Sequence, residues 1–434
     1  MSTASFKAAL RARPIRCVLA VLFTVFAASP GRAQPLLTFD QALRLAQELS
    51  RQLTAQDYAA AAAREMAVAA AQLPDPTLTA GINNLPINGA DRFSLTRDFM
   101  TMRSVGVMQQ FTRSDKRDAR AARFEREAES AESGRTLALA NLRRDTALAW
   151  LDRHYQERLR EILVAQRDEA RLQIEAADAA YRGGRGAQAD VFLARTAVAQ
   201  IEDRMAQADR QIATAKSRLA RWVGEAASQK PLAAAPSMDD LSVDWTRLDE
   251  HISHHPQIEV MIRQEQVARA EAEIAQANKR SDWSAELLYS QRGPAYSNMI
   301  SVNFSIPWQL DRKNRQDREL AAKLALIDQM QAQREEATRE HAADVRTWSQ
   351  QWQSNRDRLA RYDNSLLPLT AERTRAALAG YRGGSAPLGS VLEARRMEID
   401  TRLERVRLEM ENAGLWAQLE YLMPAGSVLK GELK

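Results

Sequence analysis

The chain has 434 residues, of which 27% are charged and 45% hydrophobic, and its formal net charge is +5. This basic excess lies in residues 1–33: removing them takes away five basic residues and no acidic one, which leaves 56 of each sign. A neutral remainder gives no argument for nucleic-acid binding, which needs a persistent basic patch. The single cysteine, Cys17, excludes disulfides and thiolate metal sites from the rest of the chain.

Residues 1–33 have the layout of a secretory signal peptide. Basic residues precede an apolar run from Cys17 to Ala28, and small residues follow near Ala33. A membrane anchor is the alternative, but the run is shorter than the roughly 20 residues that a spanning helix needs. We therefore expect export with cleavage of the signal peptide near Ala33. Since no later segment resembles a spanning helix, any contact with the membrane interior must be made by strands.

The first repeat is predicted to cover residues 34–225. A short helix is expected from Phe39 to about Leu73, and a strand hairpin over 76–112 follows it. Strong helix formers without proline then predict a long helical hairpin over 115–222, whose outgoing helix, Asp115 to Tyr181, would be about 100 Å long. Residues 148, 151, 155, 159 and 162 of that helix carry the spacing of a coiled-coil seam.

A linker and a second repeat follow. Prolines and small residues mark the linker, residues 226–244, and the second repeat is predicted over 245–434. This repeat has the same order: a short helix from about Pro256 to Arg280, a strand hairpin over 282–308, a long helical hairpin over 311–422 and a short C-terminal tail. Pro368 is expected to kink its outgoing helix.

Period-two alternation predicts two strands in each half. The apolar positions expected to face lipid are Val105, Val107, Ile300, Val302, Phe304 and Ile306, and Trp283 and Trp308 are expected at strand ends. A soluble sheet packed against the helices would show the same alternation. Export and the long rods favour lipid instead, and because four strands cannot close into a barrel, several chains would have to share one.

The two halves carry one signature at the same spacing. The sequence Tyr181-Arg182-Gly183-Gly184, followed by Asp190-Val191, recurs 200 positions later as Tyr381-Arg382-Gly383-Gly384, followed by Ser390-Val391. The chain is therefore an internal duplication, and each half is one copy of a unit that contains a strand hairpin and a helical hairpin.

This order, with the two Tyr-Arg-Gly-Gly tips, Gln110-Phe111 before Asp115, and Ser305-Ile306-Pro307, resembles the TolC-type outer-membrane efflux factors over residues 37–423. The resemblance implies a mainly α fold with a membrane β-barrel portion. Three copies would form one 12-stranded barrel, continued by a periplasmic α-helical tunnel.

The same resemblance implies the function and the partners. The chain would be the outer-membrane exit duct of a tripartite efflux system, without a cofactor and without enzymatic activity. It would work with a periplasmic adaptor and with an inner-membrane pump of the RND type. Met100-Thr101-Met102 and Lys116-Arg117 resemble the heavy-metal branch of the family. The alternative is a soluble periplasmic coiled-coil adaptor or scaffold.

The resemblance also assigns two candidate sites. The tips, residues 181–184 and 381–384, would dock the adaptor, although a glycine helix cap would explain the glycines equally well. A pore constriction would lie at Glu393 and Ser390, with Asp190 at the matching position of the first half. The alternative for Glu393 is a solvated ion pair with Arg396. The group of His251, His254 and His255 is interpreted as a solvated helix start, not as a metal site.

Overall fold

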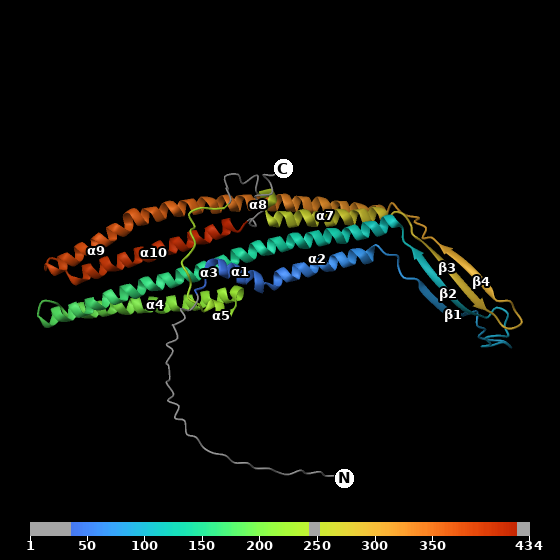
Figure 1. The fold of residues 1–434 in the computed structure, drawn as a ribbon, viewed down its shortest axis with the longest axis horizontal. Coiled ribbons are helices and arrows are strands. Elements are labelled where there is room, and N and C mark those ends of the chain that lie inside the picture. Colours follow the sequence, from blue (N-terminus) through green and yellow to red (C-terminus); the bar gives the residue numbers. More distant parts are fainter. Residues whose placement is uncertain (1–35, 243–251, 423–434) are drawn as a thin grey trace, which may run out of the picture. The chain divides into compact units, whose positions relative to one another are not determined.

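The computed structural model describes residues 36–242 and 252–422, and the elements of these ranges are shown in Figure 1. The expected signal peptide and the C-terminal tail lie outside the described residues. Within those ranges, the two strand hairpins and the long helical hairpins predicted from the sequence are present.

The first half starts with two helices, α1 (Phe39–Leu49) and α2 (Arg51–Ala70), where one helix over 39–73 was expected. The break falls at Ser50, whose backbone is extended and whose hydroxyl accepts a hydrogen bond from the backbone N–H of Leu53 at 3.3 Å. Ser50 thus caps α2 and ends α1 at the same point, because an N-cap residue leaves the helical conformation.

The long outgoing helix of this half is α3 (Ser114–Arg182), and α4 (Gln188–Val223) returns alongside it, followed by the short α5 (Glu225–Ser228). The 69 residues of α3 correspond to about 100 Å. Its predicted seam is confirmed, because Leu151 and Tyr155 are buried in the central core and the other three seam residues pack against that core.

The second half repeats this order with one interruption. A single 3-10 turn, η2 (Ile252–His254), leads into α7 (Pro256–Ala277), and α8 (Gln316–Arg361) is followed by a π-helical turn, η3 (Tyr362–Leu366). The helix then continues as α9 (Leu367–Arg382), and α10 (Leu388–Glu420) returns.

The irregularity expected near Pro368 lies just before that proline, as a π turn. Pro368 has no N–H to donate to the carbonyl four residues earlier. The backbone N–H of Leu367 instead bonds to the carbonyl of Tyr362, five residues back, which widens the turn. The helix also starts five residues later than the expected Asp311, because Asp311 and Asn314 form a hydrogen-bonded turn at 3.3 Å.

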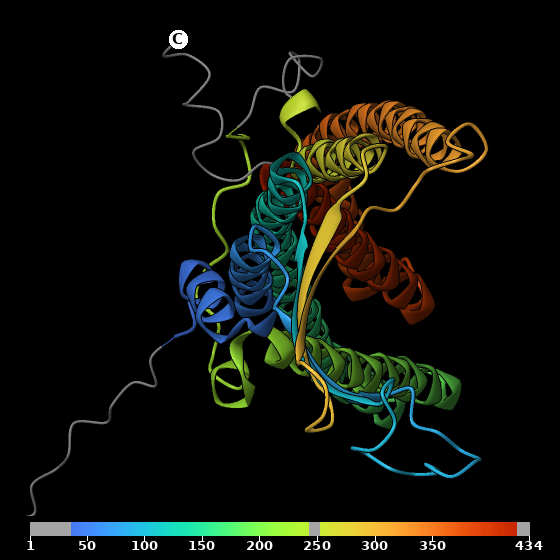
Figure 2. The same ribbon diagram turned by 90° about the vertical axis from the view of Figure 1, so that its right-hand side faces the viewer.

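The strands β1 (Thr77–Asn83), β2 (Met102–Phe111), β3 (Trp283–Gln291) and β4 (Met299–Ser305) form one antiparallel sheet in this order. The second strand of the first hairpin therefore pairs with the first strand of the second hairpin. Among the described elements, β1 and β4 have no further strand beside them, so both edges of the sheet are open (Figures 1 and 2).

The central core joins both halves at the middle of α3. Trp150 and Tyr155 are almost fully buried, and Phe39 meets the Trp150 ring edge-on at 5.4 Å. The buried guanidinium of Arg153 donates hydrogen bonds to the backbone carbonyls of Ser228 and Lys230, at 2.7 and 2.8 Å. Arg153 thus fixes the chain after α5 against α3, because charge-assisted hydrogen bonds are stronger than neutral ones.

A largely buried ion pair joins the sheet to the helices. The ammonium of Lys116, in the first turn of α3, lies 3.1 Å from the carboxylate of Asp282, next to the first residue of β3. The other carboxylate oxygen of Asp282 accepts a hydrogen bond from the backbone N–H of Arg113 at 3.1 Å. Arg117 donates to the carbonyl of Ala71, at the end of α2. Residues of three elements therefore set the position of the sheet relative to α3.

Candidate functional site

The first candidate site is one face of the sheet. The pairing register aligns Leu78, Val107, Leu287 and Val302 in one row across the four strands. The next row toward the loops aligns Ala80, Val105, Tyr289 and Ile300. Since residues two apart share a face, these rows form one continuous apolar surface.

This apolar face is exposed in the single chain. Leu78 is 76% exposed, Ile300 72% and Phe304 71%. No strand of the described part packs on a helix to any appreciable extent. The soluble alternative, in which the helices cover this face, is therefore wrong for the described chain. The face is too large to be left in water without a partner, since contiguous apolar patches of this kind mark an interaction surface.

One expected member of this face, Ile306, lies outside the strand, as does Trp308, which was expected at a strand end. Because β4 ends at Ser305, Ile306 and Trp308 belong to the segment that follows it, where both side chains are exposed. Pro307 explains the early end, since proline cannot donate to a strand ladder. Trp283 lies at the start of β3, where its ring stacks on Phe111 with centroids 4.2 Å apart.

The tips have the same backbone in both halves. After α3, the N–H of Gly184 bonds to the carbonyl of Tyr181 and the N–H of Arg185 to that of Ala180, at 3.0 and 2.9 Å. After α9, Gly384 and Ser385 make the corresponding two bonds. Gly184 and Gly384 have φ of +65° and +74°. These are the two bonds of a Schellman cap, so the glycines end the helices as the simpler interpretation expected.

The side chains of the two tips differ, however. Tyr181 and Arg182 are exposed, and Arg182 pairs with Asp178 at 2.5 Å. Tyr381 instead packs against a small cluster that joins the tips, whose buried members are Ala177, Val191, Ala194, Leu388 and Val391. Within the described chain, the first tip therefore presents an aromatic ring to the outside while the second tip uses its ring for internal packing.

The three residues expected at the constriction do not share one arrangement. The carboxylate of Asp190 accepts a hydrogen bond from the backbone N–H of Ala187 at 3.1 Å, which caps α4. Pro387 occupies the matching position before α10 and has no N–H, and the Ser390 hydroxyl donates to its carbonyl at 2.7 Å. Position 390 thus lacks the carboxylate that Asp190 provides, and position 387 lacks the backbone N–H that would donate to it.

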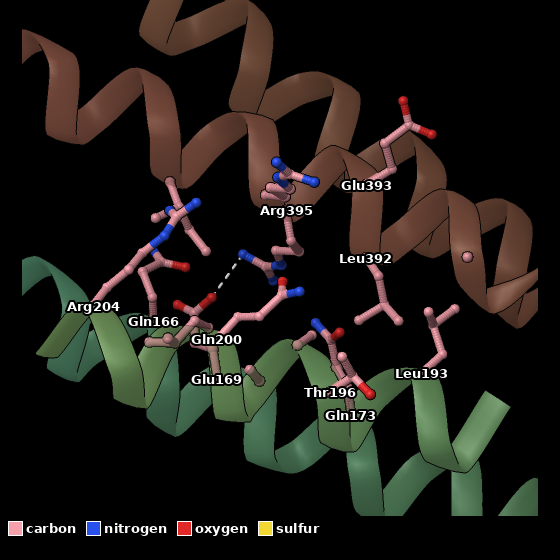
Figure 3. A pocket seen from close by; sticks show the side chains of 16 residues that line it. Gln166, Glu169, Gln173, Leu193, Thr196, Gln200, Arg204, Leu392, Glu393 and Arg395 are labelled. Carbon is pink, nitrogen blue, oxygen red and sulfur yellow. Dashed lines mark ion pairs between the residues drawn. The ribbon is translucent and has the colours of Figure 1, made fainter. Parts of the chain in front are cut away.

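Glu393 is highly exposed, and its nearest cation is not Arg396, the partner named in the alternative interpretation. Its carboxylate lies 3.9 Å from the guanidinium of Arg373 on α9, whereas Arg396 lies 3.7 Å from Asp400. Figure 3 shows the Glu393 side chain directed away from α3 and α4. The carboxylate is therefore available to solvent on one side of α10.

A cavity of ≈ 300 Å³ lies between α3, α4 and α10, near the tips (Figure 3). Two ion pairs cross it: Arg395 meets Glu169 of α3 at 2.7 Å, and Arg204 of α4 meets Asp400 at 2.7 Å. Sequence reasoning missed these clamps between the two helical hairpins. Arg395 matches Arg195 of the first half at the same spacing of 200 residues, but its acidic partner, 226 residues earlier, follows from no local pattern.

Among the described residues, the histidine group does not bring three metal ligands together. His255 caps α7 and lies against His341 with ring centroids 4.6 Å apart, while His251 lies outside the described residues. Burial, aided by repulsion from His341 and Arg144, lowers the pKa of His255 to about 4. Within residues 36–242 and 252–422, no group of three His, Cys, Asp or Glu side chains is placed to hold a metal ion. None of the helices described is both long and apolar enough to span a bilayer.

Comparison with known proteins shows the fold. No protein-family model and no curated protein matches the sequence. Solved structures do match: the outer membrane protein VceC from Vibrio cholerae has a TM-score of 0.73 at 18% identity, over 88% of this chain and 95% of that one. The CmeC outer membrane channel of Campylobacter jejuni has a TM-score of 0.74 at 10% identity, over 91% and 88%.

A structure of CusC, described in connection with transmembrane channel formation, matches with a TM-score of 0.71 at 15% identity, over 90% of this chain and 93% of that one. Matches of this extent leave only about a tenth of this chain uncovered. The chain therefore has the TolC-like fold of these outer-membrane channels, as the order of its elements predicted.

Proposed function

We propose that the chain is the outer-membrane exit duct of a tripartite efflux system. One observation carries this proposal: a four-stranded sheet with a bare apolar face and two open edges extends beyond helices of about 100 Å. A bilayer would cover the face, but an open edge in lipid leaves backbone groups unpaired at a cost of several kcal/mol each. The edges must therefore pair with other copies of the chain.

Strand directions support a closed homotrimer. Because the sheet has four antiparallel strands, β4 of one copy and β1 of the next would also run antiparallel. Three copies would form a 12-stranded barrel, within the range of known bacterial barrels. Thr79, Ser301 and Asn303 would face its interior, since they lie on the polar face. The helices would continue the duct into the periplasm, and residues 1–33 would direct export.

Cysteine crosslinking tests this arrangement. Thr79→Cys combined with Ser301→Cys or Asn303→Cys should yield covalently closed trimers, because these residues share the polar face at the two edges. Thr79→Cys with Val302→Cys is the matched control, because position 302 points to the opposite face. Crosslinks confined within single chains, or equal yields from all pairs, would contradict the shared barrel.

The tips are proposed to dock a periplasmic adaptor, which in turn binds the inner-membrane pump. The exposed ring of Tyr181 and the exposed Arg182 support this role more than the inward-packed Tyr381 does. A photo-crosslinker at position 182 should capture the adaptor in intact cells, and one at position 382 should do so less efficiently. The absence of any periplasmic crosslink from both positions would contradict tip docking.

Glu393 is proposed to form a ring of three carboxylates in the pore. Such a ring would favour cations, because a narrow pore focuses the field of its charges. Glu393→Gln should lower the cation selectivity of single channels in planar bilayers, measured from the reversal potential. Glu372→Gln removes the same charge from α9 and serves as the control. Equal selectivity of both variants would place the constriction elsewhere.

The last proposal concerns the type of pump and the class of cargo. We propose an RND-type pump and a heavy-metal cargo, supported by the methionines at 100 and 102. Lys116 and Arg117 no longer support this branch, since both have structural partners. Loss of the chain should sensitise cells to copper or zinc salts before it sensitises them to organic drugs. The reverse order would contradict the metal branch.

A further inference from the structure

The two halves differ most where a strand hairpin enters its long helix. In the first half, two residues join β2 to α3, whereas in the second half residues 306–315 join β4 to α8. We call residues 306–315 the entry loop. In Figures 1 and 2 it runs from the helix side of the sheet to the start of α8.

The apolar residues of the entry loop have no packing role in the chain. Ile306 is 64% exposed, Trp308 83% and Leu310 87%. Ile306 comes directly after the last registered pair of the sheet, Ser284 with Ser305, at the end of the apolar face nearest the helices. The loop therefore extends that face toward the helices, and it does so with large side chains that fold stability does not require.

Basic residues follow directly. Arg312, Lys313 and Arg315 are all exposed, and none of them forms an ion pair within the described residues. The acidic neighbours are otherwise engaged: Asp311 holds the side-chain amide of Asn314 at 3.0 Å, and Asp317 pairs with Lys279 at 2.8 Å. The loop thus carries three cations against one anion.

In the first half, the cations near the start of the long helix are bound to groups of the same chain. There Arg113 pairs with Asp115 at 3.2 Å, Lys116 pairs with Asp282, and Arg117 donates to a backbone carbonyl. In the second half, Arg312 attracts the Asp317 carboxylate through space, but among the described residues none of Arg312, Lys313 and Arg315 forms an ion pair. They also precede a helix, at the end where the helix dipole disfavours positive charge. These exposed cations are therefore available to an anion outside the chain.

We propose that the entry loop binds the headgroups of anionic phospholipids. The inference rests on the proposed function, which places the apolar face in a bilayer and the helix side of the sheet at one of its surfaces. Trp308 and Leu310 would lie at the depth of the glycerol groups, where tryptophan is favoured. Arg312, Lys313 and Arg315 would contact lipid phosphates, since guanidinium groups match phosphate geometry.

Transfer into vesicles tests the proposal. The full chain, purified in detergent and freed of lipid, is mixed with vesicles of phosphatidylcholine alone, or of phosphatidylcholine with about one-third phosphatidylglycerol, and floated. A cation near an anionic surface contributes about fivefold in affinity at low salt, so three contribute about 100-fold at most. The wild-type chain should therefore prefer the anionic vesicles by at least tenfold, and added salt should reduce that preference.

The variant Arg312→Gln/Lys313→Gln/Arg315→Gln should lose most of this preference while still entering both kinds of vesicle. The control, Arg339→Gln/Arg375→Gln/Arg407→Gln, removes three exposed charges that pair with acids on their own helices, and should keep the preference. Arg312→Lys/Arg315→Lys should keep it too, which separates loss of charge from misfolding. Trp308→Ser should weaken transfer into both kinds of vesicle.

The possible results separate the headgroup site from the proposed channel function. Equal transfer of the wild-type chain into both vesicles would overturn the headgroup site and leave the channel proposal intact. Equal loss in the two triple variants would overturn it as well, since bulk charge would then explain the effect. No transfer into either vesicle would overturn both the headgroup site and the proposed function.

Discussion

A charge placed on the apolar face of the sheet is the sharpest perturbation. Val302 lies at the middle of β4, in the row that also contains Leu78, Val107 and Leu287. If this row lies near the middle of the bilayer, Val302→Arg should cost about 2–4 kcal/mol in each chain. A trimer would lose about 6–12 kcal/mol, because the substitution occurs three times in one barrel.

Ser301→Arg provides the matched control on the neighbouring residue. Position 301 lies on the polar face, so its guanidinium would stay hydrated in the barrel interior, and we expect a cost below about 1 kcal/mol per chain. The assay is an equilibrium urea titration in phosphatidylcholine vesicles, with heat-resistant trimer on gels as the folded signal. Equal losses for both variants, or a larger loss for Ser301→Arg, would refute the assignment of the faces.

Three further predictions concern the rest of the chain. Lys116→Met alone should destabilise the chain by about 3–5 kcal/mol, because it leaves the largely buried Asp282 carboxylate without its partner. The double variant Lys116→Met/Asp282→Leu should recover most of this loss in the same urea titration. Gly384→Ala should cost about 1–2 kcal/mol, because alanine is strained at φ of +74°, and Gly384→Asn should cost less in thermal melts. The pKa of His255 is lowered to about 4 from the usual 6.5, so the unfolded chain takes up a proton that the folded chain excludes. Stability should therefore fall as pH decreases from about 6.5 toward 4, and His255→Asn, which retains a capping side chain, should flatten this dependence in unfolding titrations; an unchanged slope would count against it.

Most of the architecture could be predicted because it depends on local signals. Helix-forming composition and seam spacing predicted the long helical hairpins. Alternation of apolar and polar residues predicted the strands and their two faces, and the pairing register places the apolar residues of neighbouring strands on one face. The duplication added the tips, since a Tyr-Arg-Gly-Gly signature repeated at equal spacing indicates a repeated helix end. The break at Ser50 was missed, although a serine after an apolar helical segment is a known start signal.

The remaining features depend on contacts between distant segments. Arg153 and Lys116 look like surface cations in the sequence, yet both are buried. The guanidinium of Arg153 donates to the backbone carbonyl of Ser228, 75 residues away, and the ammonium of Lys116 pairs with the carboxylate of Asp282, 166 residues away. Likewise, the alternative interpretation of Glu393 paired it with Arg396, one turn along the same helix, but its neighbouring cation is Arg373 on α9. Whether a charged side chain is solvated or forms an ion pair with another helix can be decided only when the opposing helix is known.

The central claim is that the sheet lies in a bilayer, with alternate residues facing lipid and water. Spin labels placed singly at positions 300 to 304 of the reconstituted chain measure this directly through their accessibility to oxygen and to a water-soluble nickel complex. The account predicts high oxygen and low nickel accessibility at 300, 302 and 304, and the opposite at 301 and 303. Nickel accessibility at all five positions, or none of either reagent at the even ones, would contradict it.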